Sequence, residues 1–298
     1  MCAPTQATMQ ALTLHPKSLS TQVEQLPIPV PGPDELLIRV AAVGLNPVDW
    51  MFAAHPIATQ ERRVLGTDFA GTVVDRGSDA EAQGIPIGTR VAGFLQGVWH
   101  IPLHISLEQA SSISMCGLTA AQAVFGRLGL PCPFSTSLPP SSPPPIPASA
   151  EPLNILIYGS STSLGLYTAQ LLHLTSQTSS TPIRLIGAAG PSKHTLLQQK
   201  PYSYTALVDY RSPTWVSDVL SLTNGQGVDY AVDCISEGTT VMQVERTFGP
   251  RGGKLAVIRA PANGGYDTSG MRVKPAYGAV WEGLGVEVGF DDTGEPAS

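Results

Sequence analysis

Five apolar segments separated by helix-like segments constrain the fold of this chain more than any other feature of its sequence. The apolar segments cover residues 154–159, 183–189, 206–210, 228–235 and 252–258. The segments between them, residues 163–175, 192–200, 214–223 and 239–248, are about ten residues long and are typical of helices. Because parallel strands need a crossover connection, this alternation predicts a doubly wound parallel sheet and an α/β fold class.

The part of the chain before this alternation has a different pattern. Residues 35–45, 65–78 and 85–94 have the turns and β-branched runs of short strands. Helical spacing begins after Ser106, which we expect to be an N-cap. Residues 131–152 are mostly proline, serine and other small residues, and such a segment cannot form a packed core. We therefore predict a β domain over residues 1–130, a linker over 131–152 and a nucleotide-binding domain over 153–275.

The turn between the first apolar segment and the first helix reads GSSTSLG, residues 159–165. In a doubly wound sheet this turn is the usual phosphate site, because N–H groups at the start of the helix attract an anion. The glycines permit the tight turn and close helix packing, and the hydroxyls of residues 160–163 are candidate donors to a pyrophosphate. The alternative is a serine-rich helix cap without a ligand, since the usual glycine fingerprint is incomplete.

The end of the second apolar segment indicates which nucleotide would bind. An NAD site places an acidic residue there to hold the ribose 2′-OH, and residues 185–195 contain none. Ser192 and Lys193 instead offer a hydroxyl and a cation to a 2′-phosphate, which favours NADPH. The alternative for these two residues is an ordinary solvated helix start.

Composition argues against several other classes of protein. The net charge of −6 and the pI near 5.5 give no reason to expect binding to nucleic acid or to an anionic membrane. No stretch has the length and apolar character of a membrane span, and the first ten residues do not look like a secretory signal, so we expect a cytoplasmic protein. The four cysteines are far apart and form no C-x-x-C pair, which argues against a disulfide framework or a four-cysteine zinc site.

Four further stretches carry a resemblance to a known family. They read GLNPVDW, LGTDFAGTVVDRGS, IPIGTRVAGF and LEQASSISMCGLTAAQAVF, and they precede the nucleotide-binding turn. Together they resemble the medium-chain dehydrogenase/reductase superfamily, and the chain looks like its zinc-independent fungal branch of trans-acting enoyl reductases, which serve polyketide synthases in secondary metabolism. The resemblance implies a GroES-like β catalytic domain followed by a Rossmann domain for NADPH.

The resemblance also implies roles for particular residues. Zinc-dependent relatives carry a cysteine near Asn46 and a Gly-His-Glu near Gly66 to Asp68, so no metal is expected here. Thr119, within a substrate-lining segment of residues 119–126, would order substrate or nicotinamide, or could equally be a packing residue. The resemblance assigns the nicotinamide border to Pro47, Val48, Asp49 and Trp50, the pyrophosphate to Ser161, Thr162, Ser163 and Leu164, the 2′-phosphate to Gly190, Pro191, Ser192 and Lys193, and the adenosine to Tyr210.

The activity that the resemblance implies is NADPH-dependent reduction of an α,β-unsaturated thioester, acting in trans on a polyketide synthase or its acyl carrier domain. Two alternatives remain open: a reductase of free quinones or enones, and a non-catalytic relative that still holds NADPH. Met51 stands where relatives often have a lysine, and the segment of residues 93–110 is shorter than in relatives. Residues 276–298 are expected to be a shortened return segment.

Overall fold

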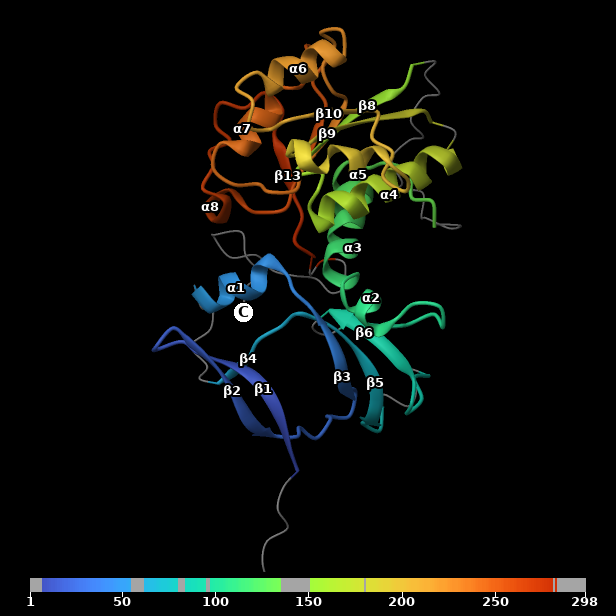
Figure 1. Cartoon of the computed structure of the whole chain (residues 1–298), viewed down its shortest axis with the longest axis vertical. Helices are drawn as coiled ribbons and strands as arrows, with labels where there is room; N and C mark the ends of the chain where they lie inside the picture. Colours follow the sequence, from blue (N-terminus) through green and yellow to red (C-terminus); the bar gives the residue numbers. More distant parts are fainter. Residues whose placement is uncertain are drawn as a thin grey trace, which may run out of the picture. The chain divides into compact units, whose positions relative to one another are not determined.

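The structure is a computed structural model that describes residues 7–54, 62–79, 84–94, 97–134, 151–179, 181–280 and 282. The chain forms two compact units, residues 1–115 and 116–298 (Figure 1). Most of the expected linker and of the expected return segment lies outside the described residues.

The first unit contains two antiparallel sheets. The smaller sheet has the strand order β2-β1-β4, and the larger sheet has the order β3-β5-β6-β7. The smaller sheet consists of β1 (Thr8–His15), β2 (Ser20–Pro27) and β4 (Arg63–Val64); the larger consists of β3 (Leu36–Gly44), β5 (Asp68–Arg76), β6 (Arg90–Phe94) and β7 (Gly97–His100). The three strands expected from residues 35–94 are confirmed, while the hairpin strand β7 was missed.

Among the described residues, two short helices belong to this unit and a third begins in it and continues into the second unit. They are α1 (Pro47–Ala54), α2 (Leu107–Ser111) and α3 (Ser114–Ala121). The predicted cap is confirmed: Ser106 accepts a hydrogen bond from the Gln109 backbone N–H, and the Gln109 side chain accepts one from the Ser106 N–H. This reciprocal arrangement is a capping box, which satisfies two donors that a helix start otherwise leaves unpaired.

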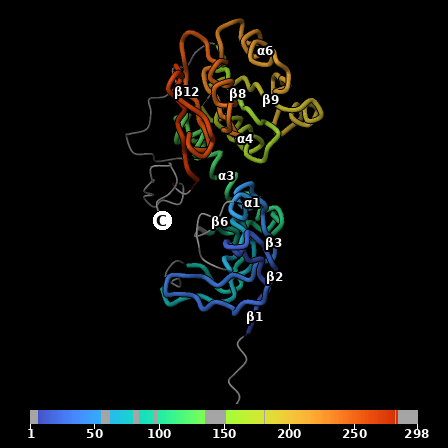
Figure 2. The backbone as a smooth tube through the Cα atoms, turned by 90° about the vertical axis from the view of Figure 1, so that its left-hand side faces the viewer, coloured from blue at the N-terminus to red at the C-terminus, as the bar shows by residue number. Residues whose placement is uncertain are grey.

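The second unit is built on a six-stranded parallel sheet with the order β10-β9-β8-β11-β12-β13. Figure 2 shows β12, β8 and β9 in this sequence across the sheet. The strands are β8 (Leu153–Tyr158), β9 (Ile183–Ala188), β10 (Ala206–Val208), β11 (Tyr230–Asp233), β12 (Lys254–Val257) and β13 (Pro275–Tyr277). The five strands predicted from the sequence are confirmed, and β13 extends the sheet beyond them.

Helices cover both faces of this sheet. Because side chains alternate along a strand, Ile155 and Ile157 of β8 pack in one core with α4 and α5, while Leu156 packs in a second core with α6 and α7 (Figure 1). The helical segments are α4 (Ser163–Ser179), α5 (His194–Gln198), α6 (Trp215–Leu222), α7 (Thr240–Glu245), α8 (Pro261–Gly264), the π-helix η1 (Gln122–Arg127) and the 3₁₀ turn η2 (Pro191–Lys193). The arrangement is the doubly wound sheet that the sequence predicts, with its first two strand-to-helix turns at one edge.

Candidate cofactor-binding site

The turn between β8 and α4 is anchored to the neighbouring strand. The backbone N–H groups of Gly159 and Ser160 both donate to the Ala188 carbonyl at 3.1 Å. The Ser160 hydroxyl, which is 0% exposed, donates to the same carbonyl at 3.1 Å. These three bonds hold the start of the turn against the end of β9.

Thr162 closes the other end of the turn. Its hydroxyl donates to the Gly159 carbonyl at 2.8 Å and accepts from the Gly165 N–H at 3.1 Å, which is the bond of a helix N-cap. The hydroxyls of Ser160 and Thr162 therefore serve the fold, contrary to the expectation that the hydroxyls of residues 160–163 all face a phosphate. Ser161 is half-buried and Ser163 is exposed, and neither hydroxyl has a partner among the described residues.

Two glycines allow the start of α4 to pack closely against the backbone of the turn. Gly159 has a φ of +74°, a backbone conformation that favours glycine. A Cβ on Gly165 would lie 2.6 Å from the Gly159 carbonyl oxygen and 2.8 Å from the Ser160 Cα. The start of α4 can pack this tightly against the turn only because residue 165 has no side chain.

The turn leaves backbone donors at the start of a long helix. Within the described part of the chain, the N–H groups of Ser161, Ser163 and Leu164 have no hydrogen-bond acceptor. Helix α4 has 17 residues, so its N-terminus carries the positive end of a substantial dipole. These donors suit a pyrophosphate, and the turn therefore fits the phosphate group of a dinucleotide.

The second turn follows β9 at the same edge of the sheet. Gly190 is buried and extended (φ −66°, ψ 142°), and its carbonyl accepts the Lys193 N–H at 2.9 Å. Pro191, Ser192 and Lys193 are exposed and form η2. Because residues 185–200 contain no Asp or Glu, this turn presents a hydroxyl and a cation without a competing carboxylate of its own.

Aromatic residues line the loop after β10. Tyr210 is 39% exposed and meets the buried Tyr158 edge to face, with ring centroids 6.1 Å apart. Tyr158 in turn packs on Trp215 at 5.4 Å. A partly exposed ring that packs on a buried tyrosine, itself packed on Trp215, provides a platform on which an adenine could stack.

Arg211 is a candidate residue that the sequence interpretation missed. Its guanidinium lies over the Tyr210 ring, 5.2 Å from the centroid, and beside Gly190. The signal in the sequence was a cation directly after Tyr210, at the end of the strand that neighbours β9 in the sheet. Only the strand order β10-β9-β8 brings this loop next to the Gly190 turn.

In the first unit, four polar residues form a hydrogen-bonded network. Asn46 Nδ2 donates to Thr67 Oγ1 at 3.2 Å and to Asp68 Oδ2 at 3.1 Å. The Thr67 hydroxyl donates to Asp49 Oδ1 at 3.1 Å, while Asp49 Oδ2 accepts the Asn46 backbone N–H at 2.8 Å. The positions where zinc-dependent relatives were expected to carry ligands are thus bonded to one another.

Asp68 is the carboxyl group of this network whose pKa is shifted by burial. Burial raises its pKa to about 6, against the opposing effect of hydrogen bonds from Asn46 and from the Met115 N–H, and the nearby Asp49 carboxylate raises it further. Asp68 is 1% exposed, so desolvation of the carboxylate dominates. The group therefore changes charge within a pH range that enzymes encounter.

The remaining predicted residues lie on two helices. Pro47 to Trp50 form the first turn of α1, where Asp49 has both carboxylate oxygens bonded within the network and Trp50 is 64% exposed. Thr119 is half-buried on α3. Among the predicted residues, the structure brings together the 161–164 turn, the 190–193 turn and Tyr210 at one edge of the parallel sheet. Whether α1 and Thr119 join them stays a prediction.

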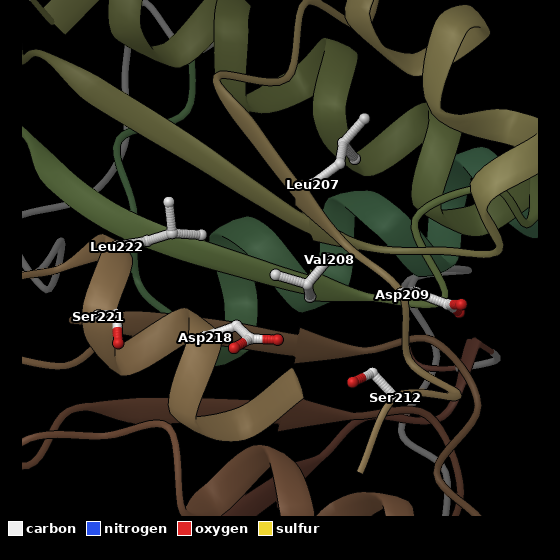
Figure 3. A pocket seen from close by; sticks show the side chains of 7 residues that line it. All are labelled: Leu207, Val208, Asp209, Ser212, Asp218, Ser221 and Leu222. Carbon is white, nitrogen blue, oxygen red and sulfur yellow. The ribbon is translucent and has the colours of Figure 1, made fainter. Parts of the chain in front are cut away.

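The structure also bears on three other features: a metal site, a membrane span and a surface groove. In the described ranges, no three His, Cys, Asp or Glu side chains are grouped so that they could hold a metal ion, and no helix is long and apolar enough to cross a membrane. An open groove of about 550 Å³ lies between β10 and α6, with Asp209, Asp218 and Ser221 in its wall (Figure 3). None of its lining residues belongs to either phosphate turn, so this groove is not the cofactor site.

Comparison with known proteins identifies the class. Residues 32–127 match the family model of the alcohol dehydrogenase GroES-like domain. A mycobacterial protein solved in complex with NADPH has a similar fold, with a TM-score of 0.70 and 23% identity over 92% of this chain and 83% of that one. A GroES-like domain joined to a six-stranded Rossmann sheet defines the medium-chain dehydrogenase/reductase superfamily of oxidoreductases.

Curated relatives identify the branch. The chain is 30% identical over 289 residues to the enoyl reductase cheB of Chaetomium globosum, covering 89% of this chain and 72% of that protein. It is also 30% identical over 256 residues to the trans-enoyl reductase ffsC of Aspergillus flavipes, covering 78% of this chain and 65% of that protein. The chain therefore belongs to the fungal enoyl reductase branch of this superfamily, and it spans about two thirds of the length of the Aspergillus relative.

Proposed function

We propose that this protein is an NADPH-dependent enoyl reductase that acts in trans on α,β-unsaturated thioesters carried by a polyketide synthase during secondary metabolite biosynthesis, in the cytoplasm. The observation that carries the proposal is the alignment with fungal enoyl reductases, which includes the phosphate turn and extends across both units.

The donor set supports a dinucleotide with a 2′-phosphate. Unpaired N–H groups at the start of α4 suit a pyrophosphate, and the turn after β9 offers Ser192 and Lys193 without an acid. An NAD site would place a carboxylate where this chain has none. The proposed cofactor is therefore NADPH rather than NADH.

Bound NADPH would supply a hydride to the β carbon of the enoyl group, and a proton from solvent would then add to the α carbon of the enolate to complete the reduction. The chain's own residues then have to bind the carrier-linked thioester, exclude water and stabilise the developing enolate oxygen with a hydrogen-bond donor. We assign that donor to the hydroxyl of Thr119. Pro47, Val48 and Trp50, in the first turn of α1, are assigned to the nicotinamide border, and the carboxylate of Asp49 holds this turn in place through Asn46 and Thr67.

The decisive experiment compares three substrates with the purified chain and NADPH. These are an enoyl thioester on an acyl carrier protein, the same enoyl group on N-acetylcysteamine, and a free enone. We expect NADPH oxidation with the carrier-linked substrate to exceed that with the other two by at least about tenfold. Equal rates would identify a reductase of free small molecules, and cofactor binding without turnover would identify a non-catalytic relative.

A matched pair of variants tests the role of Thr119. Thr119→Val removes the hydroxyl at nearly constant volume, and we expect it to lower kcat by about a hundredfold, the order of loss seen when an oxyanion donor is removed, with NADPH affinity unchanged. Thr178→Val makes the same change at an exposed position of α4 and should leave kcat unchanged. An unaltered kcat in Thr119→Val would make residue 119 a packing threonine.

A further inference from the structure

The guanidinium of Arg211 lies directly over the turn that follows β9. Its Nη2 is 3.2 Å and its Nη1 is 3.7 Å from the position that a Cβ on Gly190 would occupy. The absence of a side chain at residue 190 therefore gives the guanidinium room to sit against the backbone of this turn.

Arg211 is also held in place from its own loop. Its guanidinium carbon lies over the Tyr210 ring, 5.2 Å from the centroid, and Tyr210 is packed against the buried Tyr158. On the backbone side, the Arg211 N–H donates to Asp209 Oδ1 at 3.1 Å. A guanidinium that is already held over an aromatic ring loses less conformational freedom when it binds an anion than a free side chain would.

The charges around Gly190 favour an anionic ligand. Lys193 and Arg211 are both exposed, and the β9 turn contributes no carboxylate. Asp209 is the nearby acid, and it is half-buried and bonded to the backbone of its own loop. The Arg211 guanidinium beside Gly190 and Lys193 three residues further on thus place two cations on the loops that follow adjacent strands, where a dinucleotide-binding sheet holds the adenosine ribose.

We propose that Arg211 is a specificity-determining residue that binds the 2′-phosphate of the cofactor and makes the protein select NADPH over NADH. The inference rests on the proposed function, because it needs a nicotinamide dinucleotide in this site. Guanidinium groups bind phosphate with two parallel N–H donors, a geometry that lysine lacks. The preference for NADPH thus comes from a residue in the loop after β10, the edge strand next to β9, as well as from Ser192 and Lys193 in the turn after β9.

The test measures binding rather than turnover. Dissociation constants for adenosine 2′,5′-bisphosphate, AMP, NADPH and NADH are measured by calorimetry on the full chain. The variants are Arg211→Met, which keeps an apolar stem over Tyr210, and Arg211→Lys, which keeps the charge. Arg246→Ala, at an exposed arginine after α7, is the matched control, and thermal melts show that each variant is folded.

The expected result distinguishes the contribution of the 2′-phosphate to binding from that of the adenosine. Arg211→Met should weaken adenosine 2′,5′-bisphosphate and NADPH about tenfold, as for one lost charged hydrogen-bonding partner, while AMP and NADH change less than twofold. Arg211→Lys should lose less affinity for these two ligands than Arg211→Met, and Arg246→Ala should bind them as tightly as wild type. The salt dependence of NADPH binding should also become shallower in Arg211→Met.

Two results would overturn the inference, and they are distinguishable. If wild type selects NADPH and a folded Arg211→Met retains that selectivity, Arg211 has no such role and the proposed function stands. If folded wild type binds neither NADPH nor adenosine 2′,5′-bisphosphate, the inference and the proposed function both fail.

Discussion

The side-chain amide of Asn46 donates to Asp68 Oδ2 across 3.1 Å while its second hydrogen is directed to Thr67 Oγ1 across 3.2 Å. Asn46 and Asp68 are both buried, so this amide uses its two donors inside the protein. The pair ties the loop before α1 to the first residue of β5. It also leaves Asp68 as a buried carboxyl whose charge state depends on pH.

This burial predicts a pH-dependent stability. The pKa of Asp68 is raised from 3.8 to about 6 in the folded protein, so folding takes up a proton between about pH 4 and pH 6. Protonated Asp68 therefore stabilises the folded protein at low pH, and this stabilisation is lost as the pH rises through 6. The change in unfolding free energy amounts to roughly 3 kcal/mol, because the pKa differs by about two units between the folded and unfolded states. Asp68→Asn cannot titrate, so wild type minus variant isolates the effect in urea unfolding from pH 4 to 7. A difference that stays constant across this range would show that Asp68 is not the titrating group.

Gly165→Ala should damage both the fold and the proposed cofactor turn. Its Cβ would meet backbone atoms of Gly159 and Ser160 at 2.6 and 2.8 Å, and backbone cannot move aside as a side-chain tip can. We expect a loss of about 1–3 kcal/mol in unfolding free energy and at least about tenfold in NADPH affinity. Gly270→Ala, where nothing lies within 4 Å of the new Cβ, is the control. Wild-type stability in Gly165→Ala would mean that the turn relaxes freely.

Ser160→Ala should act on stability through the anchor to β9. The variant loses the hydroxyl bond to the Ala188 carbonyl, but that carbonyl keeps two backbone donors, so the cost should be about 1 kcal/mol. Ser163→Ala, at the exposed first residue of α4, should change the unfolding free energy by less than about 0.5 kcal/mol. Chemical denaturation of the two variants side by side measures the difference. An equal effect at both positions would contradict the anchoring role of Ser160.

Ser106→Ala should weaken the start of α2. It removes the side-chain half of the capping box with Gln109, a change that typically costs about 1 kcal/mol. Ser217→Ala, at an exposed position within α6, should be neutral or slightly stabilising because alanine has the higher helix propensity. Thermal unfolding followed by circular dichroism compares the two, and an unchanged melting temperature in Ser106→Ala would argue against the cap.

Local signals predicted much of the architecture. The strand and helix of Leu153 to Ser179, and the cap at Ser106, are set by apolar periodicity and by a side chain close in sequence, so they were visible without the structure. Helix α1 was missed although Asn46, Pro47 and Asp49 stand where an N-cap, a first-turn proline and an acidic N3 residue would. Strand β7 was missed because its four residues carry too little pattern and form a strand only by pairing with β6.

The sequence by itself determined the doubly wound sheet, the place of the turn before its first helix and the lack of an acid after β9, because each depends on residues adjacent along the chain. Tertiary structure alone decided which hydroxyls of that turn remain free, since the bond from Ser160 to Ala188 spans 28 positions. It also decided that Asp68 is buried beside Asn46 and that Arg211 reaches Gly190. These contacts depend on strand order and on desolvation, which arise only when distant segments pack together.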